Sequence, residues 1–206
     1  MRNQGLFPML RSPAKMALVT LSPFNKPWEA IMVSTPPLNP AGAFEPEPQF
    51  SHEIRTKLVG QVAELPQQLR QALEGLSESQ LETKYKNWTI RQIAHHIADS
   101  HLHSIIRFKW ALTEKHPTIK AYEEADWVEL PDAKSGDLEP SLRLLEGLHV
   151  KWCQLLDSME AGDFARTFYH PQSGESVSLW LALNNYAWHG RHHTGQILWL
   201  REQNGW

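Results

Sequence analysis

The sequence predicts an all-α protein, a four-helix bundle with a long crossover connection and a small β-hairpin before the last helix. Apolar residues recur at intervals of three and four in four separate segments, the spacing that lines one face of an α-helix. One long connection, between the second and third segments, suits a bundle with a single crossover. Hydrophobic residues make up 41% of the 206-residue chain, which is enough to build one core.

The composition excludes several classes of protein and of site. The net charge is −3 with no block of basic residues, so neither a nucleic-acid-binding surface nor a polybasic membrane patch is expected. No apolar run reaches the roughly 18 residues of a membrane-spanning helix. Cys153 is the only cysteine, which rules out an intramolecular disulfide and a thiolate metal cage and favours a reducing, cytoplasmic location. The chain is rich in histidine and tryptophan, with 11 and 9 residues.

Residues 1–45 are expected to lie outside the bundle, which we assign to residues 46–206. No helical or alternating pattern survives the prolines of the first 50 residues: Pro8, Pro13, Pro23, Pro27, Pro36, Pro37, Pro40, Pro46 and Pro48. Two explanations remain open, a flexible, solvated tail or an upstream extension of a gene whose true start is Met16 or Met32. A targeting segment is disfavoured because prolines interrupt the apolar run that it needs.

The first helix is predicted to begin after Ser51. Its apolar positions are Ile54, Leu58, Val62, Leu65, Leu69, Leu73 and Leu76. Pro66 lies within this pattern and is expected to kink or split the helix. Residues 77–86 are predicted to form a polar connector with room for one helical turn.

The second helix has a strong start signal, because Thr89 and Gln92 have the spacing of a capping box. The helix is expected to run to about Glu114, ahead of Pro117. Beside its apolar stripe it carries a polar stripe that is rich in histidine: Gln92, His96, Asp99, Ser100, His103 and Arg107. A solvated helix face is the ordinary explanation of such a stripe, and a functional site is the alternative.

The remaining elements follow from proline, glycine and apolar spacing. Residues 115–139 form the long crossover connection, and Pro140 suits the first turn of the third helix. Residues 165–178 are predicted to form the hairpin, with its turn at Ser173-Gly174. The fourth helix is expected over about 179–203.

The strongest chemical signal is the pair His189 and His193 in this last helix. Four residues apart on a helix, two imidazoles share one face and can bind a single divalent metal ion. Both fall on the apolar stripe made by Leu179, Ala182, Tyr186, Ile197 and Leu200. Two satisfied core histidines are the alternative, because an isolated HxxxH matches many unrelated helices.

In a bundle, the second helix would supply a third ligand from the facing side. Helical geometry does not choose among its four histidines, which are His95, His96, His101 and His103. Of these, His101 lies nearer the centre of the apolar stripe than the others.

Four motifs occur together in the chain: NWTIRQIAHHIADSH (87–101), LLEGLH (144–149), FYHP (168–171) and YAWH (186–189) followed by the second histidine of the pair. In combination, over about residues 45–206, they resemble the DinB/YfiT-like superfamily of metalloenzymes, and most closely its YfiT group of metal-dependent hydrolases. The resemblance implies a four-helix bundle with a three-histidine metal site, often in a homodimer. It also implies that His96 is the third ligand beside His189 and His193.

Such a site leaves a divalent metal with an open position for water, and the resemblance therefore implies a metal-dependent hydrolase acting on a small molecule. Asp99, one turn after His96, is a candidate to orient a ligand imidazole or to act as general base. Arg107 is a candidate to bind a substrate carboxylate. Asp99 could instead be an ordinary helix-surface carboxylate, and Arg107 could simply pair with a nearby glutamate. Zinc is the expected metal and nickel the alternative.

Two other functions remain open. Relatives in the superfamily resemble thiol S-transferases, in which a low-molecular-weight thiol such as bacillithiol, mycothiol or glutathione binds the metal as thiolate. A non-catalytic, metal-stabilised binding protein is the other. A fourth protein ligand such as Asp99 or Glu124 would favour it, because structural metal sites usually have four protein ligands.

Overall fold

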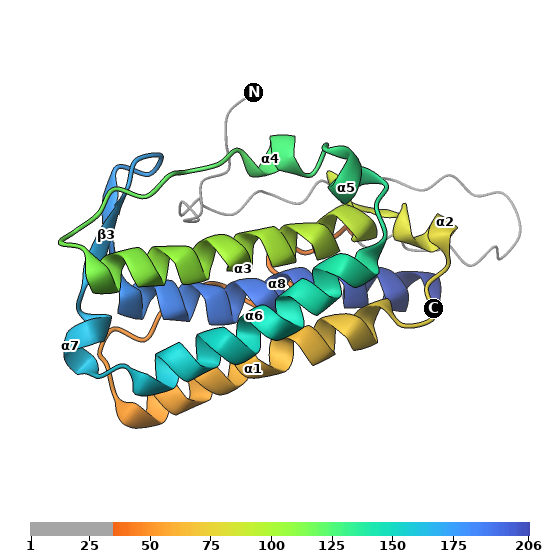
Figure 1. Cartoon of the computed structure of the whole chain (residues 1–206). Helices are drawn as coiled ribbons and strands as arrows, with labels where there is room; N and C mark the ends of the chain where they lie inside the picture. Colours follow the sequence, from red (N-terminus) through yellow and green to blue (C-terminus); the bar gives the residue numbers. More distant parts are fainter. Residues whose placement is uncertain (1–34) are drawn as a thin grey trace, which may run out of the picture.

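The computed structural model describes residues 35–206, and four long helices packed side by side dominate it (Figure 1). These are α1 (His52–Leu73), α3 (Ile90–Thr113), α6 (Leu138–Ser158) and α8 (Leu179–Asn204). α1 packs against α6 and α8, and α3 packs against the same two helices, so the predicted four-helix bundle is confirmed. None of the helices in residues 35–206 is long and apolar enough to cross a membrane.

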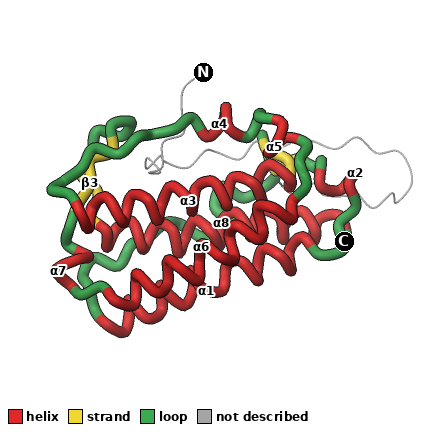
Figure 2. Tube along the Cα trace, in the orientation of Figure 1, coloured by secondary structure: helices red, strands yellow, loops and turns green. Residues whose placement is uncertain are grey.

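Short elements connect and close the bundle (Figure 2). The short helices are α2 (Glu78–Leu81), α4 (Glu124–Trp127), α5 (Pro131–Lys134) and α7 (Ala161–Phe164). Two antiparallel hairpins are formed by β1 (Lys84–Tyr85) with β2 (Trp88–Thr89), and by β3 (Thr167–His170) with β4 (Glu175–Ser178). The β3–β4 hairpin is the predicted one, whereas β1–β2 lies where only a connector was expected.

Each long helix begins at a residue whose side chain caps its first turn. The capping residues are Ser51, Thr89, Asp137 and Ser178. At α3 the predicted capping box is confirmed: the Gln92 amide N–H donates to Thr89 Oγ1 at 3.1 Å, and the Thr89 amide N–H donates to Gln92 Oε1 at 3.0 Å. This cap sets where α3 begins and therefore where its histidines lie along the bundle.

Pro66 does not split the first helix, contrary to expectation. α1 runs without interruption from His52 to Leu73 with Pro66 inside it. Pro66 and the neighbouring Leu65 and Leu69 are buried against the other helices. The packing of this face outweighs the one helical hydrogen bond that proline cannot make.

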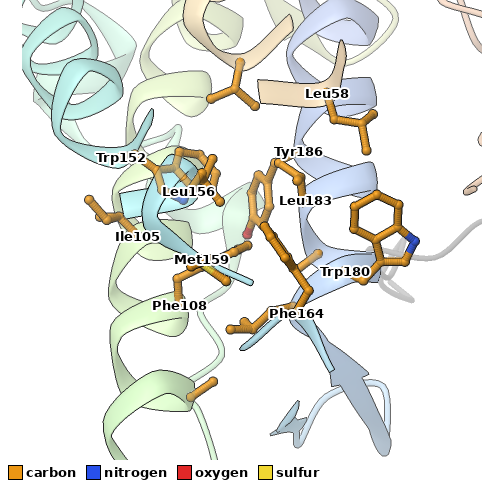
Figure 3. Packing of buried hydrophobic residues seen from close by; sticks show 14 of the residues in the cluster. Leu58, Ile105, Phe108, Trp152, Leu156, Met159, Phe164, Trp180, Leu183 and Tyr186 are labelled. Atoms are coloured by element: carbon orange, nitrogen blue, oxygen red, sulfur yellow. The ribbon is translucent and has the colours of Figure 1, made fainter. Parts of the chain in front are cut away.

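The buried side chains form two hydrophobic clusters, one toward each end of the bundle. The large cluster surrounds Trp152, Phe108 and Phe164 at the end closed by the β3–β4 hairpin (Figure 3). The small cluster includes Leu69 and Ile93 at the other end. Between them, α3 and α8 present histidines to the interior in place of aliphatic side chains, and the candidate site lies there.

The crossover connection covers the polar stripe of α3, which is therefore not the solvated face that is usual for such a stripe. The Tyr122 ring stacks on His103 at 4.2 Å between centroids, and Trp127 packs against both rings. The Gln92 side-chain amide donates to the Val128 carbonyl at 2.9 Å. The connection is thus a fixed cover on this side of the bundle.

The chain ahead of α1 also lies along the bundle. Trp188 Nε1 donates to the Gly42 carbonyl at 3.0 Å, and Trp180 Nε1 donates to the Glu47 carbonyl at 2.7 Å. The Tyr85 hydroxyl donates to the Pro37 carbonyl. These contacts begin inside the stretch predicted as a tail, residues 1–45, so its last residues lie against α8 and β1. The two possible starts, Met16 and Met32, lie outside the described residues.

Candidate metal centre

The three histidines named from the sequence come together between the two hydrophobic clusters. His96 projects from α3, and His189 and His193 project from successive turns of α8. One ring nitrogen from each lies within 4.8 Å of the others, and all three residues are buried. His96 Nε2 and His189 Nε2 are 3.2 Å apart.

This donor set fits a divalent metal ion. Two imidazole nitrogens bound at about 2.0–2.1 Å to one tetrahedral metal lie roughly 3.3 Å from each other, close to the observed spacing of His96 and His189. Burial lowers the pKa of His96 to about 3 and the pKa of His189 and His193 well below its usual value. The imidazoles are therefore neutral, the form in which histidine binds metals.

The tautomer of His193 is set by Gln196, which follows it by about one turn of α8. Gln196 Nε2 lies 3.0 Å from His192 Nε2 and donates to it, which turns the Gln196 carbonyl oxygen toward His193. That oxygen accepts a hydrogen bond from His193 Nδ1 at 2.9 Å. The proton of neutral His193 is therefore on Nδ1, and Nε2 keeps the lone pair that a metal requires.

A chain of three histidines sets the tautomer of His189 in the same sense. The Val62 carbonyl can only accept, so His149 Nδ1 carries the proton and donates to it. His149 Nε2 must then accept from His101 Nδ1, which lies 3.0 Å away. His101 Nε2 in turn accepts from His189 Nδ1, at 3.4 Å. Each neutral ring fixes the next, and His189 Nε2 is left with its lone pair directed toward His96.

We call His149, His101 and His189 the histidine relay. Burial lowers the pKa of His149 to about 4 and the pKa of His101 well below its usual value, which keeps these rings neutral. The sequence offered one signal for His101, its place near the centre of the apolar stripe of α3. His149 stood in the sequence only as the last residue of the LLEGLH motif, with no role assigned, because its partners Val62 and His101 come from two other helices, α1 and α3.

The Asp99 carboxylate is not among the groups that orient the ligand imidazoles. It makes no hydrogen bond or ion pair with any residue in 35–206, and the residues that hold the ligands are His101 and Gln196. Asp99 is half-buried and faces the crossover connection. Burial, with the nearby Asp132 carboxylate, raises the pKa of Asp99 to about 6.

Arg107 lies on the same side of α3, three turns beyond His96, and is buried. Its Nη1 donates to the Tyr186 hydroxyl at 3.0 Å. Tyr186 precedes His189 by one turn of α8, and the two rings are 6.0 Å apart between centroids. The guanidinium is therefore linked to the metal-binding helix through one side chain.

An indole borders the three-histidine cluster on the side of β2. The Trp88 ring lies 4.7 Å from the His96 ring and 6.2 Å from the His193 ring between centroids. Within residues 35–206 no fourth histidine, cysteine or carboxylate joins the group, so neither Asp99 nor Glu124 is a fourth ligand. Three protein ligands and an apolar border are typical of a metal site that keeps a position open.

Comparisons with known proteins agree with this geometry. A family model described as the DinB superfamily matches residues 61–197. A Bacillus mycoides (strain KBAB4) protein named "Putative metal-dependent hydrolase" is 47% identical over 169 residues, which are 81% of this chain and 96% of that protein. A protein of the same name from Geobacillus thermodenitrificans (strain NG80-2) is 43% identical over 169 residues, 81% of this chain and 95% of the relative.

A solved structure is similar over nearly its whole length. It is described as "YfiT from Bacillus subtilis is a probable metal-dependent hydrolase with an unusual four-helix bundle topology". The TM-score is 0.79 at 42% sequence identity, and the match covers 82% of this chain and 97% of that chain.

Proposed function

Because this chain belongs to the DinB superfamily, we propose that it is a metal-dependent hydrolase whose divalent metal is held by His96, His189 and His193. The observation that carries the proposal is the convergence of these three neutral imidazoles on one point with no fourth protein ligand in residues 35–206. Three ligands hold a metal and leave a position for water or substrate. We propose zinc as the metal, with nickel as the alternative, because imidazole suits both.

When bound, such a metal lowers the pKa of a coordinated water to about 7 and so supplies a nucleophile at neutral pH. The chain's own residues prepare the site for it. The relay and Gln196 hold two of the three imidazoles in the metal-binding tautomer before metal arrives. Trp88 shields the cluster from bulk water, which strengthens electrostatic interactions inside it.

Asp99 is the residue we propose to exchange protons with solvent during turnover. Its carboxyl has a pKa of about 6, close to neutrality, and is only half-buried. A carboxylate with such a pKa can accept a proton near pH 7 and release it again. Its side chain also has no hydrogen bond in residues 35–206 that would have to break first.

Metal analysis of protein purified without a His tag tests the metal centre. We expect one divalent ion per chain in the wild type and loss of that ion in His193→Ala, with helix content retained by circular dichroism. His116→Ala, which removes an exposed histidine far from the cluster, is the matched control and should keep its metal. Stoichiometric metal in His193→Ala would overturn the assignment.

The same protein distinguishes hydrolysis from S-transfer. Cys153 packs in the core beside the Val59 carbonyl, and no protein thiol reaches the site, so a thiolate would have to come from a small molecule. A thermal shift with low-molecular-weight thiols that depends on bound metal would favour S-transfer, and no shift would favour hydrolysis of an ester or amide.

We also propose that the chain forms a homodimer, which light scattering after size-exclusion chromatography measures directly.

A further inference from the structure

Arg107 is a buried cation that makes no ion pair in residues 35–206. Its side chain is 3% exposed, and no carboxylate oxygen in residues 35–206 lies within 4.0 Å of its nitrogens. The Glu124 carboxylate is near enough for the Arg107 charge to act on its pKa, but it lies beyond ion-pair distance. Among the described residues, only Arg107 Nη1 has a hydrogen-bond partner, the Tyr186 hydroxyl. Nε and Nη2 are buried and make no hydrogen bond with a described residue. Two donors of a charged group are thus held in the interior with no hydrogen-bond partner in the described part of the chain.

The other deeply buried arginine shows how this fold normally treats such a charge. Arg91 is 5% exposed and all three of its nitrogens are engaged. Nε binds Glu82 at 2.8 Å, Nη1 donates to the Gly136 carbonyl at 2.8 Å, and Nη2 binds Glu78. Arg91 therefore has the full set of partners expected of a structural arginine, whereas Arg107 has a partner for only one of its three nitrogens among the described residues.

The free donors of Arg107 face a small cavity between α3, α8 and the β3–β4 hairpin. Besides Arg107, its polar lining is His170, Asn185 and Tyr186. Both ring nitrogens of His170 are buried without a hydrogen-bond partner among the described residues, and the buried Asn185 lines the cavity beside them. No carboxylate lines the cavity, and the rest of its wall is apolar. The cavity therefore holds unused donors of a charged group and has no anionic acceptor in its lining.

An arginine cannot escape this situation by losing its proton, as a buried lysine or histidine can. A buried, unpaired charge is costly and is kept where something else compensates it. We propose that this cavity is a carboxylate-binding site, in which Arg107, with His170 and Asn185, binds the carboxylate of a small organic acid. The fork of Nε and Nη2 matches the two oxygens of a carboxylate.

The cavity favours a carboxylate over a phosphate. It is small, with room for about one water molecule before side chains move, so the smaller anion fits more readily. Arg107 is its only cationic residue, because burial and the Arg107 charge lower the pKa of His170. One guanidinium balances a monoanion and leaves a dianion half-compensated.

The position of the cavity specifies a substrate class, a step that rests on the proposed hydrolase. Tyr186 and Ala182, which line the cavity, precede His189 by three and seven residues on α8. At 1.5 Å per residue, these two lining residues lie roughly 5–10 Å along the helix from His189, the nearer metal ligand on α8. The substrate would be a small carboxylic acid whose ester or amide bond lies a few bonds from its carboxylate, with the acid held by Arg107 and the bond presented to the three histidines.

The binding site can be tested without metal or turnover. Butyrate is the probe, butyramide is its neutral isostere and chloride controls for ionic strength. Binding is followed by thermal shift and by NMR titration in the full-length chain, both as purified and in His193→Ala, so that a carboxylate bound to metal is not counted. At ten times its Kd, butyrate should raise the melting temperature of both proteins by about 3–6 °C. Butyramide and chloride should not.

Variants separate a ligand-binding arginine from a structural one. Arg107→Gln should abolish the butyrate shift, and Arg107→Lys, which keeps the charge but not the fork, should weaken binding about tenfold. Without ligand, Arg107→Gln should melt at or above the wild-type temperature, because it removes an uncompensated charge. Arg166→Gln is the control for a structural arginine. Arg166 donates hydrogen bonds to the Ala111 and Glu114 carbonyls, so this variant should lower stability without changing butyrate binding.

Three results would overturn the proposal. They are equal shifts with butyrate and butyramide, unchanged butyrate binding in Arg107→Gln, or a strongly destabilised Arg107→Gln that behaves like Arg166→Gln. Failure of the metal assignment would leave this test intact, because it is also run in His193→Ala. Butyrate binding to a wild-type protein that takes up no metal on reconstitution would keep the carboxylate site and reject the proposed metal-dependent hydrolase.

Discussion

Replacing His101 by phenylalanine should weaken metal binding although His101 is not a ligand. His101 is 0% exposed and packs on the rings of His149, Trp152 and Tyr186, so a phenylalanine of similar size keeps the packing. The substitution removes His101 Nε2, the acceptor for the N–H of His189; the two nitrogens, His189 Nδ1 and His101 Nε2, are 3.4 Å apart. His189 then either buries an unsatisfied N–H or moves its proton to Nε2, the atom that faces His96.

The size of the effect follows from these two outcomes. A buried donor without a partner costs about 1–3 kcal/mol, and a proton on Nε2 must be displaced before metal binds. Loss of an outer hydrogen-bond partner typically reduces metal affinity 10–100-fold, which corresponds to about 1.4–2.8 kcal/mol. We therefore expect Kd for Zn²⁺ to rise by one to two orders of magnitude in His101→Phe.

Competition titration of Zn²⁺ against a chromophoric chelator measures this change, and ¹⁵N NMR of the imidazoles reports the tautomer directly. His101→Gln, whose amide oxygen can still accept, should retain more affinity than His101→Phe. His103→Phe is the matched control, because this ring lies on the same helix but stacks on Tyr122 outside the relay. A His101→Phe protein that binds Zn²⁺ within twofold of the wild type would refute the relay.

Two further predictions concern how the bundle holds the site. A Cβ at Gly190 would lie 2.4 Å from Leu65 Cδ2, so Gly190→Ala should force α1 and α8 apart beside His189 and lower the free energy of unfolding by about 1–3 kcal/mol in urea denaturation. Gly147→Ala in α6, where a Cβ meets nothing within 4 Å, should instead stabilise the protein by about 0.5–1 kcal/mol. Thr89→Ala removes the side-chain cap of α3 and should lower the free energy of unfolding by about 0.5–2 kcal/mol. An unchanged denaturation midpoint would show that this cap does not stabilise the start of α3.

Much of the helical architecture was predictable because its signals are local. A cap such as Thr89 with Gln92, or a turn such as that at Gly174, is decided within about four residues, and the 3.6-residue period of apolar side chains is visible in one segment. The i, i+4 spacing of His189 and His193 belongs to the same class. One local rule failed, at Pro66, where the packing of a long helix outweighed the preference of a single residue.

The choice of His96 among four histidines was not local. Helical spacing on α3 left it open, and the resemblance to a known family made it. The structure gives the physical reason: His96 faces the pair on α8, whereas His101 turns its two nitrogens to His189 and His149. Residues five apart on a helix point in different directions, so only one of them can meet the metal.

By itself, then, the sequence determined the long helices, the capped start of α3 and the paired histidines of the last helix, because each depends on neighbours along the chain. Only the tertiary structure decided how these parts work together. The relay joins residues separated by 48 and 88 positions, and Arg107 meets Tyr186 across 79. Whether a buried histidine is a ligand or a support, and whether a buried arginine is paired, depends on which groups packing brings from other helices, and no local pattern records that.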